Sequence, residues 1–258
     1  MVGTAGSALV TGGARGIGAA LAEALVARGD RVVIADVDEV AARQLTERLG
    51  DAATFARCDV TREDEVAAAV DLAAAHGPLG AVFANAGAVG VTGRIEEHDL
   101  SDYRRSVDLL LTSVFLTIKH AVRVMRPAGA GAIVCTASVA SVRGGLGPHV
   151  YTAAKHAVRG LVESVAVDVA RDGLTINAVA PGGVVTSLAA GLMGDRDDLE
   201  VPYRRLAAAS SSGRPTTAAD VAQAALFLAA APRINGACLV IDGGDSVLGS
   251  AGRQSYYA

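Results

Sequence analysis

Lysine is nearly absent from this chain of 258 residues. Only Lys119 and Lys155 are lysines among 23 basic residues, and the formal net charge is −4. Acidic and basic residues alternate along the chain, and no basic stripe of the kind that binds nucleic acids is present. The composition therefore argues against a nucleic-acid partner. Because arginine is the default cation here, each lysine is a candidate for chemistry that arginine does not perform.

Cysteines and long apolar runs are also scarce. Cys58, Cys135 and Cys238 are far apart and show no metal-ligand spacing, so we expect buried thiols, no metal site and a reducing compartment. No uncharged apolar stretch reaches the roughly 18 residues of a membrane helix. Residues 1–7 lack the basic and apolar regions of a signal peptide. We therefore expect a cytoplasmic protein with no membrane partner.

Short apolar segments rich in β-branched residues alternate with helical patterns along the whole chain. Several of these segments lack polar alternation, which indicates strands that are covered on both faces. Thr61 with Asp64, and Thr217 with Asp220, are expected helix starts. The expected strands are Ser7–Val10, Arg31–Ala35, Ala53–Cys58, Ala81–Ala84, Ala132–Thr136, Leu174–Val179 and Ala237–Ile241. The two longest expected helices are Arg104–Arg126 and Tyr151–Arg171.

This alternation predicts the α/β fold class. We expect a single doubly wound, Rossmann-type domain over residues 1–258, with a seven-stranded parallel sheet and helices on both faces. Ser187–Gly213 has no clear role in the sheet. It is interpreted either as a lid over the substrate or as an ordinary surface insertion.

A glycine-rich turn follows the first strand. Thr11 is followed by Gly12, Gly16 and Gly18, with Arg15 and Ile17 between them, at the start of the first helix. Glycines let the backbone approach a pyrophosphate closely, and the helix N-terminus offers unpaired N–H groups and a partial positive charge. The position of the turn predicts a dinucleotide site.

Asp36 ends the second strand, 18 residues after Gly18. A carboxylate at this place accepts hydrogen bonds from the ribose hydroxyls of NAD and repels the 2′-phosphate of NADP. The alternative is a helix N-cap, and Arg15 offsets part of the repulsion. Asp59 and Val60 follow the third strand and are expected to meet the adenine. Asn85, Ala86 and Gly87 follow the fourth strand at the sheet edge where such folds bind ligands.

Ser138, Tyr151 and Lys155 form the expected catalytic group. Tyr151 and Lys155 are four residues apart on one helix, so they share a face. Interconversion of a ketone and an alcohol needs a proton donor or acceptor at the oxygen, and tyrosine performs this best when its pKa of about 10 is lowered. An ammonium about 4 Å away favours the phenolate by about 4 kcal/mol at an effective dielectric of about 20. Ser138 is expected to bind the substrate oxygen.

These motifs together resemble the short-chain dehydrogenase/reductase family over almost the whole chain. The resemblance rests on six matching segments. It implies that Lys155 also binds the nicotinamide ribose, that Pro181, Gly182, Val184 and Thr186 hold the nicotinamide end, and that the protein is a homotetramer with its two long helices at one interface. The six segments are Thr11–Gly18, Asn85–Gly87, Ser138, Tyr151 with Lys155, Asn177–Gly182 and Asp242–Gly244.

Two features refine this resemblance. The segments Ser141–Tyr151 and Ile34–Asp38 resemble the subgroup that contains secoisolariciresinol and xanthoxin dehydrogenases, which oxidise secondary, often ring-borne alcohols with NAD. In contrast, Leu110 stands where the family pattern has an asparagine that helps to hold a proton-relay water. We therefore expect a rerouted proton path, through the hydroxyl of Ser106 or Ser113 or through the ribose contact of Lys155 alone.

The sequence thus predicts an oxidoreductase that transfers a hydride between NAD(H) and a small secondary alcohol or ketone, with cyclic substrates expected. One alternative is a degenerate family member that binds NAD(H) as a sensor or scaffold without turnover, which only Leu110 favours. Another is an NADPH-dependent 3-oxoacyl reductase, with which Asp36 conflicts.

Overall fold

Alternate residues of the central strands face two separate hydrophobic cores. The structure is a computed structural model that describes residues 6–192 and 198–247. In β1 (Ser7–Thr11), Leu9 lies in one core while its neighbours Ala8 and Val10 lie in the other. β2 (Arg31–Asp36) repeats this alternation with Val33 in one core and Ile34 in the other. Both cores are apolar, so the strands carry no polar face, which explains their continuous apolar sequences.

The main sheet is parallel and has seven strands in the order β3-β2-β1-β4-β5-β6-β9. The order reverses direction between β1 and β4, and such a switch point opens a crevice at the carboxyl ends of the strands. The sheet confirms the expected fold. The remaining strands are β3 (Ala53–Arg57), β4 (Leu79–Ala84), β5 (Gly131–Thr136), β6 (Leu174–Pro181) and β9 (Cys238–Ile241), with a separate two-stranded pair, β7 (Val184–Val185) and β8 (Thr216–Thr217).

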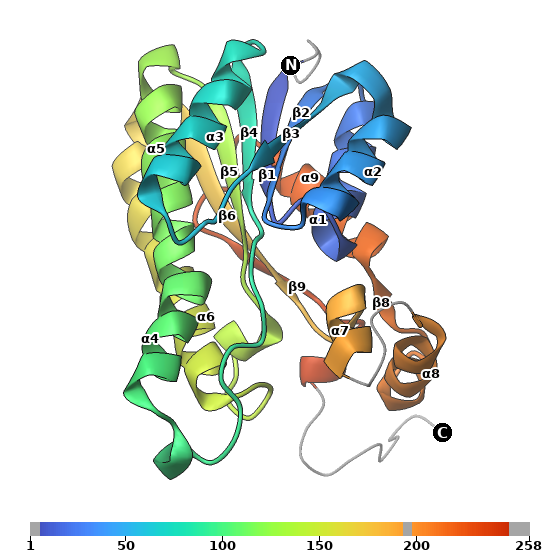
Figure 1. Cartoon of the computed structure of the whole chain (residues 1–258). Coiled ribbons are helices and arrows are strands. Elements are labelled where there is room, and N and C mark those ends of the chain that lie inside the picture. Colours follow the sequence, from blue (N-terminus) through green and yellow to red (C-terminus); the bar gives the residue numbers. More distant parts are fainter. Residues whose placement is uncertain (1–5, 193–197, 248–258) are drawn as a thin grey trace.

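Helices cover both faces of the sheet (Figure 1). One core contains side chains of α1 (Gly16–Ala27), α2 (Glu39–Leu49) and α9 (Ala218–Ala229). The other contains side chains of α3 (Glu63–Ala75), α5 (Ser113–Ala128) and α6 (His149–Val169). The other helices described are α4 (Leu100–Val107), α7 (Ser187–Leu192) and α8 (Glu200–Ala209).

The long helix that we expected over Arg104–Arg126 is not one regular helix. It begins at Leu100 as α4, passes through a π-helical turn at Asp108–Thr112, and continues as α5. Such turns are rare, interrupt the regular hydrogen-bond pattern and often mark functional sites. The three successive leucines 109–111 fit an α-helical or a π-helical turn equally well, so the sequence does not reveal it.

Two smaller expectations at helix starts had different outcomes. Thr217 and Asp220 form a reciprocal capping box at the start of α9, as predicted. In contrast, α3 begins at Glu63 and its N-cap is Arg62, so Thr61 does not cap it. Thr61 instead binds the carboxylate of Asp59.

The three cysteines are free thiols, of which Cys58 and Cys135 are buried. Cys58 lies just after β3 and not within it.

The segment that we interpreted as a lid contains α7 and α8. Figure 1 shows both helices at the end of the molecule where the sheet strands have their carboxyl ends. Residues 193–197 of this segment lie outside the described residues, so the lid stays a prediction. Over residues 6–192 and 198–247, no helix combines the length and apolar character that crossing a membrane requires.

Candidate active site

The glycine-rich turn packs so closely that side chains would not fit. A Cβ on Gly12 would lie 2.7 Å from Cα of Ala86, and one on Gly18 would lie 2.0 Å from the carbonyl oxygen of Gly12. Gly16 has a φ of +54°, and its Cβ would lie 3.3 Å from Cγ2 of Thr186. Glycine is therefore required at these positions for the turn to meet β4 and the segment after β6.

The start of α1 is suited to an anion. Arg15 is its N-cap residue and makes no side-chain cap, and the first turn of α1 holds no acidic residue. Unpaired N–H groups at a helix start bind phosphate well. A pocket of about 310 Å³ opens beside this turn. It is lined by Arg15, Gly16, Val185, Thr186, Ser187, Leu199 and Ala218. The turn and the pocket fit the pyrophosphate part of a dinucleotide.

Asn85 joins the glycine turn to the two neighbouring strands. Its amide donates to the carbonyl oxygens of Thr11 (3.2 Å) and Gly12 (3.1 Å). Its side-chain oxygen accepts from the hydroxyl of Thr136, at the end of β5, at 3.1 Å. The hydroxyl of Thr11 in turn accepts from the backbone N–H groups of Asn85 and Ala86. The Asn85 side chain is thus committed to holding the site together, a role that the sequence analysis did not foresee.

The carboxylate of Asp36 is fixed at the end of β2. One oxygen accepts from the backbone N–H of Ala14 and the other from that of Asp38, both at 2.9 Å. The N-cap of α2 is Asp38, whose side chain accepts from the N–H of Ala41, so the alternative interpretation of Asp36 as an N-cap is wrong. Arg15 donates to Asp38 at 2.8 Å. The positive charge expected to offset Asp36 is therefore paired with a second acid.

The segment that carries the residues expected at the nicotinamide end begins at the end of β6, and its last residue, Thr186, lies against the glycine turn. Pro181 ends β6, and the N–H of Gly182 donates to the carbonyl of Ile241 on β9. Val184 begins β7 and is buried, and Thr186 contacts the space beside Gly16. Residues 181–186 thus cross from the end of the sheet to the start of α1.

Ser138, Tyr151 and Lys155 come together between β5 and α6. Ser138 follows the end of β5, and a side-chain hydrogen bond joins it to Tyr151. A Cβ on Gly147 would lie 2.9 Å from the Tyr151 ring, so this glycine lets the preceding loop pack on the tyrosine. Lys155 is only 4% exposed, and its Nζ lies 5.6 Å from the centre of the Tyr151 ring. Ser138 and Lys155 are buried and Tyr151 is half-buried, so the three predicted residues form one group that is largely shielded from water.

Lys155 is anchored by a backbone carbonyl. Its Nζ donates to the carbonyl oxygen of Thr136 at 2.7 Å. Burial lowers the pKa of Lys155 to about 8, because a charged amine loses its hydration when it is removed from water. Thr136 thus makes two contacts: its carbonyl accepts from Lys155, and its hydroxyl donates to Asn85. Sequence reasoning missed Thr136, because the decisive atom is part of the backbone.

The pKa of Tyr151 corrects one expectation. We expected Lys155 to lower it, but in the structure burial raises it, and the hydrogen bond from Ser138 acts in the opposite direction. Burial penalises the phenolate, and the ammonium of Lys155 is directed to the carbonyl of Thr136. Ser138 is therefore the residue that favours the phenolate here.

Leu110 occupies the π-helical turn and is fully buried. Its Cδ2 and the Nζ of Lys155 both lie within 4 Å of the point where a Cβ on Gly87 would stand. The two hydroxyls that we considered for a rerouted proton path already donate to carbonyls, Ser106 to Asp102 at 2.8 Å and Ser113 to Leu109 at 2.6 Å. These bonds favour the other alternative, in which Lys155 acts without a relay through this helix.

Comparison with known proteins identifies the family. A family model described as enoyl-(acyl carrier protein) reductase matches residues 12–246. The chain is 44% identical to cis-4-hydroxycyclohexanecarboxylate dehydrogenase of Sinomonas cyclohexanicum over 92% of this chain and 95% of that protein. It is 39% identical to secoisolariciresinol dehydrogenase of Forsythia intermedia, over 94% of this chain and 90% of that protein. The crystal structure of levodione reductase superposes with a TM-score of 0.84 and 30% identity, over 94% of this chain and 98% of that one.

These similarities cover most of both chains in each pair. The protein therefore belongs to the short-chain dehydrogenase/reductase family, as the sequence motifs predicted, and it is an oxidoreductase of this family.

The bond between Ser138 and Tyr151 predicts a shift in pH dependence. If Tyr151 accepts the proton in alcohol oxidation, as the sequence predicts, the rate rises as the pH rises through the pKa of Tyr151. In Ser138→Ala the hydrogen bond that lowers this pKa is lost, so the rise should move to higher pH. The measurement is kcat/KM for alcohol oxidation as a function of pH. A slower variant with an unshifted profile would instead limit Ser138 to orienting the substrate.

Proposed function

We propose that the protein is an NAD-dependent dehydrogenase or ketoreductase that interconverts a cyclic secondary alcohol and the corresponding ketone. The observation that carries the proposal is the group of Ser138, Tyr151 and Lys155, which hydrogen bonds through Thr136 and Asn85 connect to the glycine turn. The names of two relatives support cyclic substrates, since one acts on a hydroxycyclohexanecarboxylate and another is a borneol dehydrogenase.

The chemistry divides between the cofactor and the protein. A bound nicotinamide cofactor supplies the acceptor or donor of the hydride. Ser138 binds the substrate oxygen, and the hydroxyl of Tyr151 takes or gives the proton at that oxygen. Lys155 holds the nicotinamide ribose, and its amine lies near the tyrosine ring. Pro181, Gly182, Val184 and Thr186 bound the nicotinamide end, and Gly12, Arg15, Gly16, Ile17 and Gly18 surround the pyrophosphate.

The preference for NAD rests on the adenine ribose end of the site. Asp36 is held by two backbone N–H groups, and Arg15 is paired with Asp38. A 2′-phosphate would therefore meet a fixed carboxylate and no unpaired arginine from the glycine turn. Asp59 and Val60 are assigned to the adenine, and Asn85, Ala86 and Gly87 to the wall between the turn and the substrate.

We also propose that the protein acts in the cytoplasm, as expected from its sequence.

The cofactor preference is tested at Asp36. The unaltered protein should use NAD with a higher kcat/KM than NADP in the oxidation of a cyclic secondary alcohol such as borneol or a substituted cyclohexanol. Asp36→Ala removes the charge that repels the 2′-phosphate, so the ratio of the two kcat/KM values should fall by about tenfold or more. Equal use of both cofactors by the unaltered protein would contradict the proposal. If neither borneol nor any substituted cyclohexanol is oxidised with either cofactor, the proposed substrate class is wrong.

Two apolar faces of the chain support a homotetramer. Leu111, Thr112, Phe115, Ala157 and Leu161 line an open hollow of about 450 Å³ over α5 and α6. On another side, Phe227 of α9 and two residues of the edge strand β9, Leu239 and Val240, are partly exposed. Two different two-fold interfaces on one chain generate a closed tetramer.

Substitutions on the two faces test this assembly. Phe115 is 48% exposed and Phe227 57%, so a glutamate at either place should disturb an interface and spare the fold. Light scattering should report dimers for Phe115→Glu and for Phe227→Glu, and monomers when both are combined. A monomeric unaltered protein would rule the tetramer out.

A further inference from the structure

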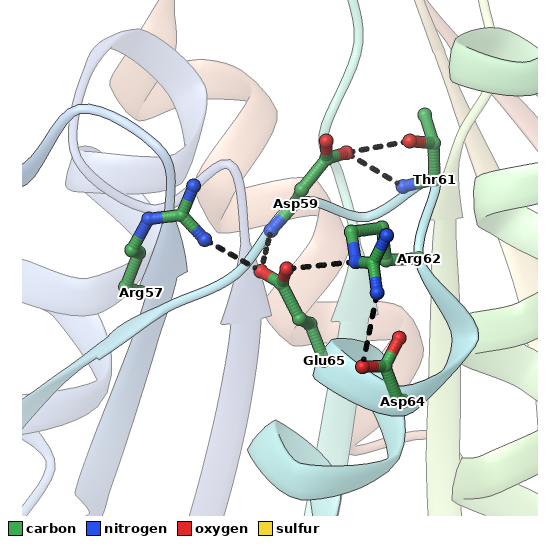
Figure 2. Close-up of polar contacts among 6 residues, drawn as sticks. All are labelled: Arg57, Asp59, Thr61, Arg62, Asp64 and Glu65. Carbon is green, nitrogen blue, oxygen red and sulfur yellow. Dashed lines mark hydrogen bonds and ion pairs between the residues drawn. The ribbon is translucent and has the colours of Figure 1, made fainter.

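Glu65 connects three residues around the end of β3 (Figure 2). It lies in the first turn of α3 and is 21% exposed. One carboxylate oxygen accepts from the backbone N–H of Asp59 and from Nη1 of Arg57, both at 2.8 Å. The other oxygen lies 3.0 Å from Nε of Arg62. Both oxygens are thus occupied, and the side chain reaches from its helix back to the preceding loop.

The Asp59 side chain has one oxygen engaged and one available. Oδ1 accepts from the N–H of Thr61 at 2.9 Å and from its hydroxyl at 2.7 Å. These bonds lower the pKa of Asp59, so the group is a carboxylate that only accepts hydrogen bonds. No protein hydrogen bond to Oδ2 exists in the part of the chain that the structure describes, and Figure 2 shows this oxygen directed away from the network.

Asp59 lies beside the strand that carries Asp36. In the sheet Arg57 is the register partner of Asp36, and the N–H of Cys58 donates to the carbonyl of Asp36. Asp59, the next residue after Cys58, therefore lies close to Asp36, where we expect the adenine ribose. A carboxylate there would accept a hydrogen bond from the 6-amino group of adenine. The 6-oxo group of hypoxanthine is itself an acceptor, so it would face the carboxylate with no donor between them.

Glu65 protects this carboxylate from competition. Arg57 and Arg62 lie on either side of Asp59 in the chain, and both are near enough to lower its pKa electrostatically. Without Glu65, Arg57 would lose its partner acid, Arg62 would keep only its 3.3 Å pair with Asp64, and the N–H of Asp59 would lose its acceptor. The guanidinium of Arg57 would then be released next to the carboxylate of Asp59. We propose that Glu65 is a positioning residue that keeps Asp59 available to select adenine over a 6-oxo purine. This inference rests on the proposed function, which places adenine here.

The test compares two reduced cofactors by direct binding. Nicotinamide fluorescence gives a Kd for NADH and for the reduced nicotinamide hypoxanthine dinucleotide, so no turnover is needed. The unaltered protein should bind NADH more tightly by about tenfold or more, since a hydrogen bond to a charged group is at stake. In Glu65→Leu the ratio of the Kd for the hypoxanthine cofactor to the Kd for NADH should fall towards one, mainly because the Kd for NADH rises.

Three further variants make the test specific. Glu65→Gln keeps an oxygen for the N–H of Asp59 but lacks the charge that holds the arginines, so its ratio should fall by about twofold or more and stay above that of Glu65→Leu. If Glu65→Leu does not fold, this variant decides alone. Asp59→Asn should abolish the preference. Glu63→Leu is the matched control, because Glu63 lies on the same helix turn and pairs with Lys119 and His120 instead; its ratio should be unchanged.

The results separate this inference from the proposed function. A folded Glu65→Leu or Glu65→Gln protein with the unaltered ratio would overturn the role of Glu65. An unaltered protein that binds both cofactors equally would overturn the selection of adenine by Asp59. A titration with NADPH tests the proposed NAD preference independently, because the 2′-phosphate would meet Asp36 whereas the hypoxanthine would meet Asp59.

Discussion

The candidate site depends on one contact, the hydrogen bond from the buried amine of Lys155 to the carbonyl of Thr136. A lysine removed from water needs a fixed polar partner, and here the partner is the carbonyl of Thr136 at the carboxyl end of β5. The hydroxyl of the same Thr136 binds Asn85, and the amide of Asn85 holds the carbonyls of Thr11 and Gly12. One chain of hydrogen bonds therefore runs from Lys155 on α6 to the glycine turn. An arginine would not replace this lysine, because its planar group has a different shape and stays charged.

Charge pairing shapes the other end of the site. Arg15 and Arg57 are both near the end of β2, where isolated arginines would attract a phosphate. Each is paired with an acid from the start of a neighbouring helix, Arg15 with Asp38 and Arg57 with Glu65. Individual surface ion pairs contribute little stability, about 0–1 kcal/mol. Their value here is positional, because they direct two positive charges away from the carboxylates of Asp36 and Asp59.

Most of the fold follows from periodicity, and much of the site does not. Apolar strands without alternation predict a covered parallel sheet. The glycine turn, Asp36 and the Tyr151–Lys155 spacing predict the candidate dinucleotide site and the helix that carries the candidate catalytic pair. The π-helical turn at Asp108–Thr112 is not predicted by these rules, because its three successive leucines fit an α-helical turn equally well. The role of Asn85, the contact of the Thr136 carbonyl and the contacts of Glu65 all depend on atoms that the fold brings together from different strands, helices and loops. The pKa of Tyr151 depends on burial, which residue spacing does not measure.

The central claim is that Tyr151 transfers the proton while Lys155 and the glycine turn hold the cofactor. The most direct measurement is turnover of a cyclic secondary alcohol by Tyr151→Phe, together with the Kd for NADH of the same variant. The account predicts that turnover falls by about 10² or more, as for loss of a general acid–base group, while NADH binding persists. Near-normal turnover by Tyr151→Phe would contradict it.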